Sequence, residues 1–263
     1  MSRVVLITGA ASGLGWALTG TFLAAGDQVV LADRDEDLLR QRQQECADQT
    51  RTLIRTCDVT DRQQLADLVA QVEAHFGRLD VLINNAGITH RSAAADTDPQ
   101  VLKQVMAVDW QGPVDLTLLA LPMLKRSRGQ IICIGSMAGW MPVPGRAAYC
   151  AAKSALAQFF EVLRLEVSAD GVSVLMVYPS FLDTPIEQNA LGHDGQKAKH
   201  ARSTVGNIRS ADWMAEKIIA AADNRRAWLF PDGLSAFASI LWRVWPSMYM
   251  RLIRRRFSSE LQR

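Results

Sequence analysis

Tyr149, Lys153 and Ser136 carry side chains that could together move the proton of an alcohol hydroxyl. Tyr149 and Lys153 are four residues apart in a stretch with helical character, so both lie on one face of a predicted helix. A tyrosine is a poor base because its ordinary pKa is about 10, but a nearby ammonium group lowers that pKa by stabilising the phenolate. Ser136 follows a predicted strand, and its hydroxyl could hold a substrate oxygen in place. Taken singly, the three could be a half-buried aromatic, a surface charge and a loop residue, so it is their joint arrangement that indicates chemistry.

A glycine-rich turn near the start of the chain could cradle phosphate groups. It follows the first predicted strand, opens the first predicted helix and reads Thr8-Gly9-Ala10-Ala11-Ser12-Gly13-Leu14-Gly15. Glycine lets the backbone turn tightly and approach a pyrophosphate, and the helix N-terminus offers N–H groups and a partial positive charge. An ordinary strand-to-helix turn is the alternative, but the position at the first strand of an alternating chain favours a dinucleotide site.

Asp33 is placed to select between the two nicotinamide dinucleotides. It ends the second predicted strand, eighteen residues after Gly15, where a carboxylate can accept hydrogen bonds from the adenosine ribose and would repel a 2′-phosphate. This favours NAD as the cofactor. Arg34 favours NADP, because an arginine can pair with a phosphate, although it could equally be a solvated charge beside the adenine. NADP is therefore kept as the alternative cofactor.

Strands and helices alternate along most of the sequence, and this order must position the residues above. Short apolar runs predict strands at residues 4–7, 29–32, 52–56, 81–83, 131–134, 172–178 and 227–230. Amphipathic stretches between them predict helices at residues 14–25, 35–47, 61–76, 99–125, 147–169 and 210–222.

The alternation predicts an α/β protein with a doubly wound parallel sheet, the three-layered Rossmann fold. The carboxyl ends of parallel strands meet at one edge, where ligands bind, so the glycine turn, Asp33 and Ser136 should come together there. We see no linker, repeat or low-complexity segment and expect one domain over residues 1–263. Residues 185–210 are polar and predict a substrate loop, and residues 233–263 predict an atypical helical tail that Pro246 divides into two helices.

Composition excludes several other classes of protein. Hydrophobic residues make up 49% of the chain and charged residues 21%, which is typical of a globular protein. The net charge of +2 is too small to indicate nucleic acid as a partner, and the basic run at 254–256 has no wider basic face. The late apolar run at 234–242 is nine residues long, whereas a membrane span needs about 20.

The cysteines and the first residues favour a cytoplasmic location. The four cysteines, Cys46, Cys57, Cys133 and Cys150, form no C-x-x-C pair, and we expect reduced thiols and no metal site. The chain enters a predicted strand at once, with no basic region followed by an apolar stretch and a cleavage site. We therefore expect no secretory signal.

The motifs together resemble those of the short-chain dehydrogenase/reductase family, from residue 3 to about residue 185. The resemblance rests on the glycine turn, Ser136, and the segments Asp58-Val59, Asn84-Asn85-Ala86-Gly87 and Tyr149-Cys150-Ala151-Ala152-Lys153. It implies an NAD(P)-dependent oxidoreductase acting on CH–OH donors. In the roles that the resemblance implies, Tyr149 is the general acid/base and Ser136 polarises the substrate oxygen. Lys153 binds the nicotinamide ribose and lowers the pKa of the tyrosine.

The resemblance also implies which residues hold the cofactor. Asp58 would contact the adenine, and Leu182 and Thr184 would meet the nicotinamide carboxamide. The full expected set is Thr8, Gly9, Ala11, Ser12, Gly13, Leu14, Gly15, Asp33, Arg34, Asp58, Val59, Asn85, Ala86, Gly87, Tyr149, Lys153, Pro179, Leu182 and Thr184.

Two positions depart from the family pattern. Asp109 stands where the family usually has an asparagine that helps hold a proton-relaying water near the lysine, and we count it with the catalytic residues. Its charge would stabilise protonated Lys153 but partly cancel the cation felt by Tyr149, so we expect an active enzyme with a more alkaline tyrosine pKa. Ser180 stands where the family usually has glycine, and we expect it to narrow the nicotinamide pocket with little chemical effect.

The substrate pocket is expected to be mostly apolar, which favours a lipophilic secondary alcohol or ketone. In the family, the segment after Thr184 folds over the substrate. We expect the four histidines, His75, His90, His193 and His200, to be surface residues. The candidates for the pocket lining are Met137, Ala138, Trp140, Met141, Val143, Phe181 and Ile186.

The tail combines aromatic and aliphatic residues with arginines and allows two interpretations. Its helices could pack their apolar face on the domain or on a second subunit. They could instead form an interfacial anchor, with aromatics in the lipid headgroup layer and arginines facing anionic lipid. The residues concerned are Phe237, Leu241, Trp242, Trp245, Tyr249, Leu252 and Ile253, with Arg243, Arg251, Arg254, Arg255 and Arg256.

Three functions are therefore left open. The first is an oxidoreductase that transfers hydride between a nicotinamide and an alcohol or ketone. The second is a catalytically silent dinucleotide-binding regulator, which Asp109 favours and the intact Ser136, Tyr149 and Lys153 disfavour. The third is a membrane-peripheral reductase of lipids, which is compatible with the first. The family resemblance also implies a homodimer or homotetramer built on the helices at 99–125 and 147–169.

Overall fold

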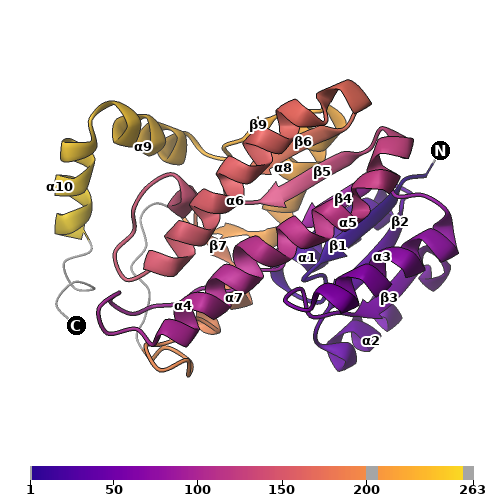
Figure 1. The fold of residues 1–263 in the computed structure, drawn as a ribbon, viewed down its shortest axis with the longest axis horizontal. Coiled ribbons are helices and arrows are strands. Elements are labelled where there is room, and N and C mark those ends of the chain that lie inside the picture. Colours follow the sequence, from indigo (N-terminus) through magenta and orange to yellow (C-terminus); the bar gives the residue numbers. More distant parts are fainter. Residues whose placement is uncertain (1, 200–206, 257–263) are drawn as a thin grey trace.

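A seven-stranded, wholly parallel sheet forms the centre of the computed structural model, which describes residues 2–199 and 207–256 (Figure 1). The strand order is β3-β2-β1-β4-β5-β6-β9, as expected for a doubly wound sheet. The strands are β1 (Val4–Thr8), β2 (Gln28–Asp33), β3 (Thr52–Thr56), β4 (Val81–Asn84), β5 (Gln130–Ile134), β6 (Ser173–Val177) and β9 (Trp228–Leu229).

The order of the strands reverses at β1, which creates the binding edge of the sheet. From β1 the chain builds outward through β2 and β3, then returns to place β4 on the other side of β1. The connection after β1 therefore runs toward β2, and the connection after β4 runs the opposite way, toward β5. A crevice forms between them at the carboxyl ends of β1 and β4. Ligands of open α/β sheets bind in the crevice at this reversal point.

Helices cover both faces of the sheet and make the three layers. On one face α1 (Gly13–Ala24), α2 (Glu36–Glu45) and α8 (Ala211–Asp223) contribute buried side chains such as Phe22, Leu39 and Ile218 to one core. On the other face, α3 (Arg62–Phe76), α5 (Gly112–Ser127) and α6 (Ala147–Glu166) build a second core. The sheet is buried on both sides, which is why its strands are continuous apolar runs.

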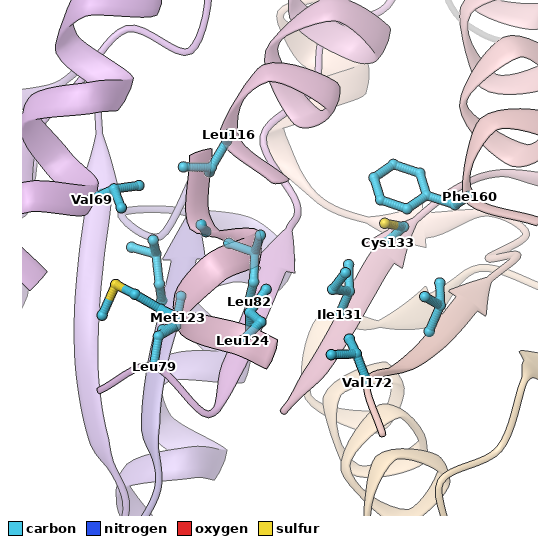
Figure 2. Close-up of a cluster of buried hydrophobic side chains, with 14 of the residues drawn as sticks. Val69, Leu79, Leu82, Leu116, Met123, Leu124, Ile131, Cys133, Phe160 and Val172 are labelled. Carbon is cyan, nitrogen blue, oxygen red and sulfur yellow. The ribbon is translucent and has the colours of Figure 1, made fainter. Parts of the chain in front are cut away.

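The second core is the larger of the two and anchors the elements that carry the site. Removing one such Leu, Ile or Val side chain from water stabilises the fold by about 1.5–3 kcal/mol. Figure 2 shows part of this core, where α3, α5 and α6 meet β4 and β5; its labelled members are Val69, Leu79, Leu82, Leu116, Met123, Leu124, Ile131, Cys133, Phe160 and Val172.

The helix expected at 99–125 is interrupted in its middle. It consists of α4 (Pro99–Met106), a π-helical turn (Ala107–Gln111) and α5, which ends at Ser127. A π-turn adds a residue to the helical repeat and redirects the side chains within it. Here it turns Asp109 into the protein interior, where the side chain is completely buried. The residue that follows the turn is Gly112, and a side chain does not fit there because its Cβ would lie 2.6 Å from the Val59 carbonyl oxygen.

The described parts of the expected substrate loop, residues 185–199 and 207–210, contain short regular elements. They begin with the short helix α7 (Pro185–Gln188), and β8 (Arg209–Ser210) pairs in parallel with β7 (Leu182–Asp183). Leu191 bonds through its backbone to Thr89 and Arg91, which ties the segment to the region after β4. His193 is exposed as expected, and His200 lies outside the described residues.

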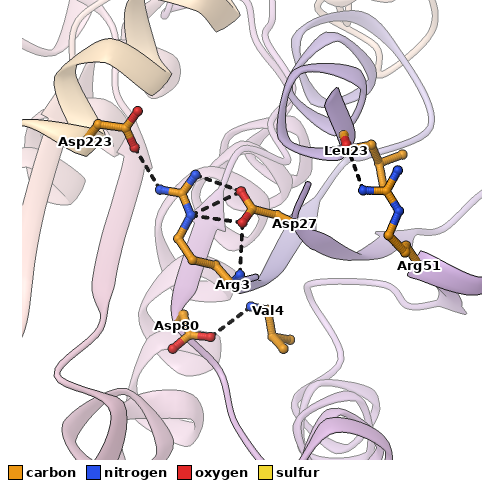
Figure 3. A network of polar contacts seen from close by, with 7 residues as sticks. All are labelled: Arg3, Val4, Leu23, Asp27, Arg51, Asp80 and Asp223. Atoms are coloured by element: carbon orange, nitrogen blue, oxygen red, sulfur yellow. Dashed lines mark hydrogen bonds and ion pairs between the residues drawn. The ribbon is translucent and has the colours of Figure 1, made fainter. Parts of the chain in front are cut away.

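A polar network fastens the amino-terminal edge of the sheet, opposite the binding edge (Figure 3). The Arg3 guanidinium forms an ion pair of 2.7 Å with Asp27 before β2 and one of 2.8 Å with Asp223 at the end of α8. Asp80, just before β4, accepts a hydrogen bond of 2.8 Å from the Val4 backbone N–H. Three segments distant in sequence are thus held at the start of β1.

The tail forms two helices, α9 (Gly233–Val244) and α10 (Pro246–Arg256), at one end of the molecule (Figure 1). The division falls at Pro246, as expected. Trp242 of α9 lies edge-on to Tyr249 of α10, with ring centroids 5.4 Å apart. Within the described ranges, no helix has the length and apolar character needed to cross a bilayer.

Candidate active site

A cavity of about 430 Å³ opens at the carboxyl ends of the central strands. Its walls come from the segments that follow β1, β2, β4, β5 and β6, from the start of α6, and from α9 and α10. Most of the expected cofactor residues line it: Gly9, Ser12, Gly13, Leu14, Asp33, Arg34, Asp58, Val59, Asn85, Ala86, Gly87, Tyr149, Lys153, Pro179, Leu182 and Thr184.

The other three expected cofactor residues, Thr8, Ala11 and Gly15, stand behind the wall and shape it. The Thr8 hydroxyl accepts hydrogen bonds of 3.1 Å from the backbone N–H groups of Asn85 and Ala86, which joins the ends of β1 and β4. Gly15 has no room for a side chain, because a Cβ there would collide with the Gly9 carbonyl oxygen. These residues therefore hold the turn in shape and do not themselves line the cavity.

The turn has the form of a cradle for a phosphate-bearing group. Gly9 has a φ of +64°, in the region that favours glycine, and a Cβ there would lie 2.9 Å from the Ala86 backbone. Gly13 has a φ of +52° and stands against Thr184 and Pro185, where α7 begins. Absent side chains leave the first turn of α1 open to the cavity, so its N–H groups can be offered to an anion.

Asp33 lies where it would select the cofactor. Its carboxylate accepts a hydrogen bond of 3.1 Å from the Ala11 backbone N–H, so the turn after β1 fixes the acid at the end of β2. Arg34 also lines the cavity. A second arginine, Arg42, lies over the Trp16 ring and donates to the Ala11 carbonyl at 3.0 Å.

Ser136, Tyr149 and Lys153 come together on one wall of the cavity. Ser136 follows β5 and accepts a hydrogen bond of 3.1 Å from the Ala138 backbone N–H, which begins a short 3₁₀ turn at Met137–Gly139. Tyr149 and Lys153 are on successive turns of α6, and the Lys153 Nζ lies 5.7 Å from the centroid of the Tyr149 ring.

Lys153 is held from behind by Asp109. The ammonium group lies 3.2 Å from Asp109 Oδ2 and donates a hydrogen bond of 3.1 Å to the Ile134 carbonyl. Asp109 Oδ1 accepts a hydrogen bond of 2.8 Å from the Ile88 backbone N–H. Asp109 does not line the cavity itself. Burial is the largest single cause and disfavours the charged lysine, but Asp109 and Tyr149 together act more strongly in the other direction, so the pKa of Lys153 is raised.

The pKa of the Tyr149 hydroxyl is raised above its usual value. Burial is the largest cause, and the Asp109 carboxylate adds to it, whereas the Lys153 ammonium and the Ser136 hydroxyl act in the opposite direction. The direction is the one expected from the aspartate at position 109. A raised pKa keeps the Tyr149 phenol protonated at neutral pH.

His90 is completely buried, so its expected placement on the surface was wrong. Its Nε2 accepts a hydrogen bond of 3.1 Å from the backbone N–H of Ala148, in the first turn of α6. The N–H groups of a first helical turn have no partners within the helix, and the imidazole satisfies one of them. Burial, together with the nearby Arg146 charge, lowers the pKa of His90 to about 4, so the ring is neutral.

One end of the cavity carries a group of charged residues that sequence analysis missed. Arg146 and Arg91 both pair with Glu187 of α7, at 3.0 and 2.9 Å, and Arg146 also donates to the Thr89 hydroxyl at 3.0 Å. Arg146, Thr89 and Glu187 line the cavity. Nothing in the sequence pattern pairs these residues, because they are distant in the chain and belong to no motif of the family.

The remaining lining is mostly apolar and agrees with expectation except at Trp140. Trp140 turns away from the cavity and packs edge-on against Tyr178 and Phe230, with centroids 5.3 and 5.7 Å apart. The expected residues that do line the cavity are Met137, Ala138, Met141, Val143, Phe181 and Ile186.

The tail packs on the domain, as one of its two interpretations expected, and it also supplies the roof of the cavity, which was not expected. Ala238 of α9 and Tyr249 and Ile253 of α10 line the cavity, and the Tyr249 hydroxyl donates a hydrogen bond of 3.3 Å to the Pro142 carbonyl. Ser180, at the position where the family usually has glycine, donates a hydrogen bond of 2.8 Å to Asp232, just before α9. The Ser180 hydroxyl thus links the segment that follows β6 to the residue before α9.

Comparisons with known proteins agree with the fold and the motifs. A family model described as short chain dehydrogenase matches residues 3–194. Dehydrogenase/reductase SDR family member 7B of Bos taurus is 36% identical over 268 residues, which cover 98% of this chain and 82% of the relative. A Drosophila melanogaster protein described as dehydrogenase/reductase SDR family protein 7-like is 34% identical, over 97% of this chain and 80% of its own.

A solved structure gives the same result. The structure of a short-chain dehydrogenase from Streptomyces avermitilis matches with a TM-score of 0.80 and 27% identity, over 100% of this chain and 97% of that one. The fold and these matches define the class: an oxidoreductase built on the Rossmann fold. The chain belongs to the short-chain dehydrogenase/reductase family.

Proposed function

We propose that the protein is an NAD(H)-dependent oxidoreductase that interconverts a lipophilic secondary alcohol and its ketone. The observation that carries the proposal is the placement of Ser136, Tyr149 and Lys153 on the cavity wall that continues from the glycine turn. A protein that only bound a dinucleotide would have no use for a tyrosine with an ammonium group behind it.

Two features of the cavity would suit a dinucleotide. Gly9 and Gly13 have no side chains to keep a phosphate away from the backbone, and Asp33 provides a carboxylate in the wall. The N–H groups of α1 would hold the pyrophosphate, Asp33 the adenosine ribose, and Lys153 the nicotinamide ribose. A bound nicotinamide would supply the acceptor or donor of hydride. The carboxylate of Asp33 repels a 2′-phosphate and favours NAD, with NADP as the alternative because Arg34 lies beside it.

The proton is handled by residues of this chain. In the oxidation direction, Ser136 donates a hydrogen bond to the substrate oxygen and orients it, while the Tyr149 phenolate accepts the hydroxyl proton. In the reduction direction, the neutral phenol returns that proton to the carbonyl oxygen. The Lys153 ammonium stabilises the phenolate, and Asp109 keeps the lysine protonated. The negative charge of Asp109 also reduces the extent to which the ammonium lowers the pKa of Tyr149.

The apolar lining and the tail support the remaining parts of the proposal. Met141, Val143 and Phe181, under a roof of Tyr249 and Ile253, would accommodate an apolar substrate. We further propose a cytoplasmic, homodimeric or homotetrameric enzyme of the class that acts on CH–OH donors, with no nucleic-acid partner.

The proposal is tested by titrating the purified protein with NADH and NADPH, followed by a screen of hydrophobic secondary alcohols at alkaline pH. We expect tighter binding of NADH, measured by nicotinamide fluorescence, and turnover of at least one alcohol. In the Asp33→Ser variant the preference should shrink or reverse, because the repelling charge is gone. Tighter binding of NADPH by the unaltered protein would contradict the assignment of Asp33.

Replacing Asp109 with asparagine should move the pH dependence of alcohol oxidation toward lower pH. The Asp109 carboxylate raises the pKa of Tyr149, so its removal lowers that pKa and the phenolate forms at lower pH. The measurement is kcat/KM against pH for both proteins, with Asp67→Asn on the exposed face of α3 as the matched control. A profile that stays in place would show that the charge at 109 does not reach the tyrosine.

A silent dinucleotide-binding protein is the second candidate, and Asp109 is the observation that favours it. A carboxylate against Lys153 cancels part of the charge that makes the tyrosine reactive. On this alternative, the protein would bind NADH and turn over no alcohol, even as the Asp109→Asn variant.

A further inference from the structure

The outer surface of α9 and α10 is unusually apolar for an exposed surface. Eleven large hydrophobic residues of the described chain are exposed, and six of them fall within residues 233–256. Val244 is 78% exposed and Phe237 63%. The six are Phe237, Ile240, Val244, Trp245, Met250 and Leu252.

These side chains are not the ones that roof the cavity. The roof uses Ala238, Tyr249 and Ile253, on the inner side of the two helices. On α9, Phe237, Ile240 and Val244 recur at helical spacing on the side away from Ala238, so this helix has a second apolar side that faces outward. On α10, Met250 and Leu252 flank the side that faces the cavity, and arginines lie opposite it. A helix that is apolar around most of its circumference is normally covered on both sides, by protein or by lipid. We call the exposed apolar surface formed by the six residues above, none of which lines the cavity, the outer face.

The charged residues within α9 and α10 are all positive. Residues 233–256 contain five arginines, Arg243, Arg251, Arg254, Arg255 and Arg256, and no aspartate or glutamate. The whole chain has a net charge of +2, so the rest of it carries −3 and the positive charge is concentrated on this segment. Arg251, Arg254, Arg255 and Arg256 are exposed on α10.

This charge decides between the two coverings that an apolar face could have. A second copy docked through the outer face about a twofold axis would bring Arg251, Arg254 and Arg255 toward the same three arginines of its partner, with no carboxylate on either helix to offset the repulsion. An anionic bilayer offers partners for both kinds of residue: an apolar environment for Phe237 and Trp245, and negative charge for the arginines. Aromatics at the headgroup level with arginines beside them are typical of interfacial helices.

We propose that the outer face of α9 and α10 docks on a membrane surface that contains anionic lipid. The helices lie in the interface and do not span it, in agreement with the lack of a spanning helix among the described residues. The proposal concerns binding and does not depend on the reaction. Because the same helices roof the cavity, docking brings the cavity to the lipid surface.

The experiment is co-sedimentation of the full chain with two kinds of vesicle, pure phosphatidylcholine and phosphatidylcholine with about a third phosphatidylglycerol. We expect the protein to sediment with the anionic vesicles and to be released as salt is added. Changing Arg251, Arg254 and Arg255 to glutamine should weaken binding about fivefold for each arginine. The double variant Phe237→Ser/Trp245→Ser should lose most of the binding that remains at high salt.

Matched controls distinguish binding through the outer face from non-specific binding through apolar or cationic residues elsewhere on the protein. Ile208→Ser/Trp228→Ser removes two apolar residues of similar exposure elsewhere, and Arg40→Gln/Lys217→Gln/Arg226→Gln removes three exposed cations on other elements. Both control variants should bind as the unaltered protein does. A thermal unfolding midpoint for each variant shows whether it is folded, and binding is measured without substrate.

Three results would overturn the proposal. The unaltered protein could fail to distinguish anionic vesicles from neutral ones. The tail variants could bind as tightly as the control variants. Light scattering could instead show a dimer that Phe237→Ser/Trp245→Ser abolishes, with no vesicle binding, in which case a second copy covers the outer face.

Discussion

Replacing Tyr149 with phenylalanine is expected to lower kcat for alcohol oxidation by on the order of 10²–10⁴-fold, the range associated with a positioned acid or base. The substitution removes one oxygen and keeps the ring, so the contact between the ring and Lys153 Nζ can persist. Affinity for NADH should therefore change little. Measured together, kcat and the dissociation constant of NADH separate loss of chemistry from loss of binding.

Tyr178→Phe is the matched control for this experiment. Tyr178 is completely buried against Trp140 and Phe230 and does not line the cavity. Its hydroxyl can be removed without touching the proposed proton path, so kcat should stay close to that of the unaltered protein. If Tyr149→Phe retained full turnover, the proton would have to pass through another group and the proposed mechanism would be wrong. If the unaltered protein and Tyr178→Phe both bound NADH but turned over no alcohol, the interpretation as a silent dinucleotide-binding protein would be favoured.

Acid should destabilise the protein through His90, by on the order of 3 kcal/mol between pH 6.5 and pH 4. The folded state keeps this imidazole neutral, with a pKa lowered to about 4, whereas in the unfolded chain it titrates near the ordinary value of 6.5. Between these two values the unfolded state binds more protons, so stability rises with pH. The loss therefore begins as the pH falls through 6.5 and is complete below about 4.

The measurement is the free energy of urea unfolding as a function of pH, for the unaltered protein and for His90→Gln. Glutamine can still present an oxygen to the Ala148 N–H that the imidazole caps, but it cannot take up a proton. The variant should lose the part of the pH dependence that lies between pH 6.5 and 4. His75→Gln, at an exposed position on α3, is the control and should retain the full dependence. Equal slopes for His90→Gln and the unaltered protein would refute the assignment.

The parts of the site that the sequence predicted are those set by local order along the chain. The glycine turn, Asp33 and Ser136 each follow a strand directly, so knowing that the strands are parallel was enough to bring them to one edge. Tyr149 and Lys153 share a helix face by their spacing alone. For the same reason the order of strands and helices was predicted closely.

The parts that were missed depend on contacts between distant segments. The 99–125 stretch was predicted as one helix, and the π-turn within it coincides with the close approach of Gly112 to Val59 and the ion pair between Asp109 and Lys153. His90 lies in a loop, and its burial depends on α6 and on Leu191 covering it. Trp140 is adjacent to good lining residues, but its ring finds aromatic partners on the opposite side.

The roof of the cavity has a consequence for how the protein is made. The strands that cradle the cofactor, β1, β2 and β4, lie within the first 84 residues, and the wall with Ser136, Tyr149 and Lys153 follows by residue 153. Tyr249 and Ile253 are translated about 100 residues later than Lys153, since a chain leaves the ribosome from its N-terminus. The cavity therefore cannot be complete until these last helices have left the ribosome.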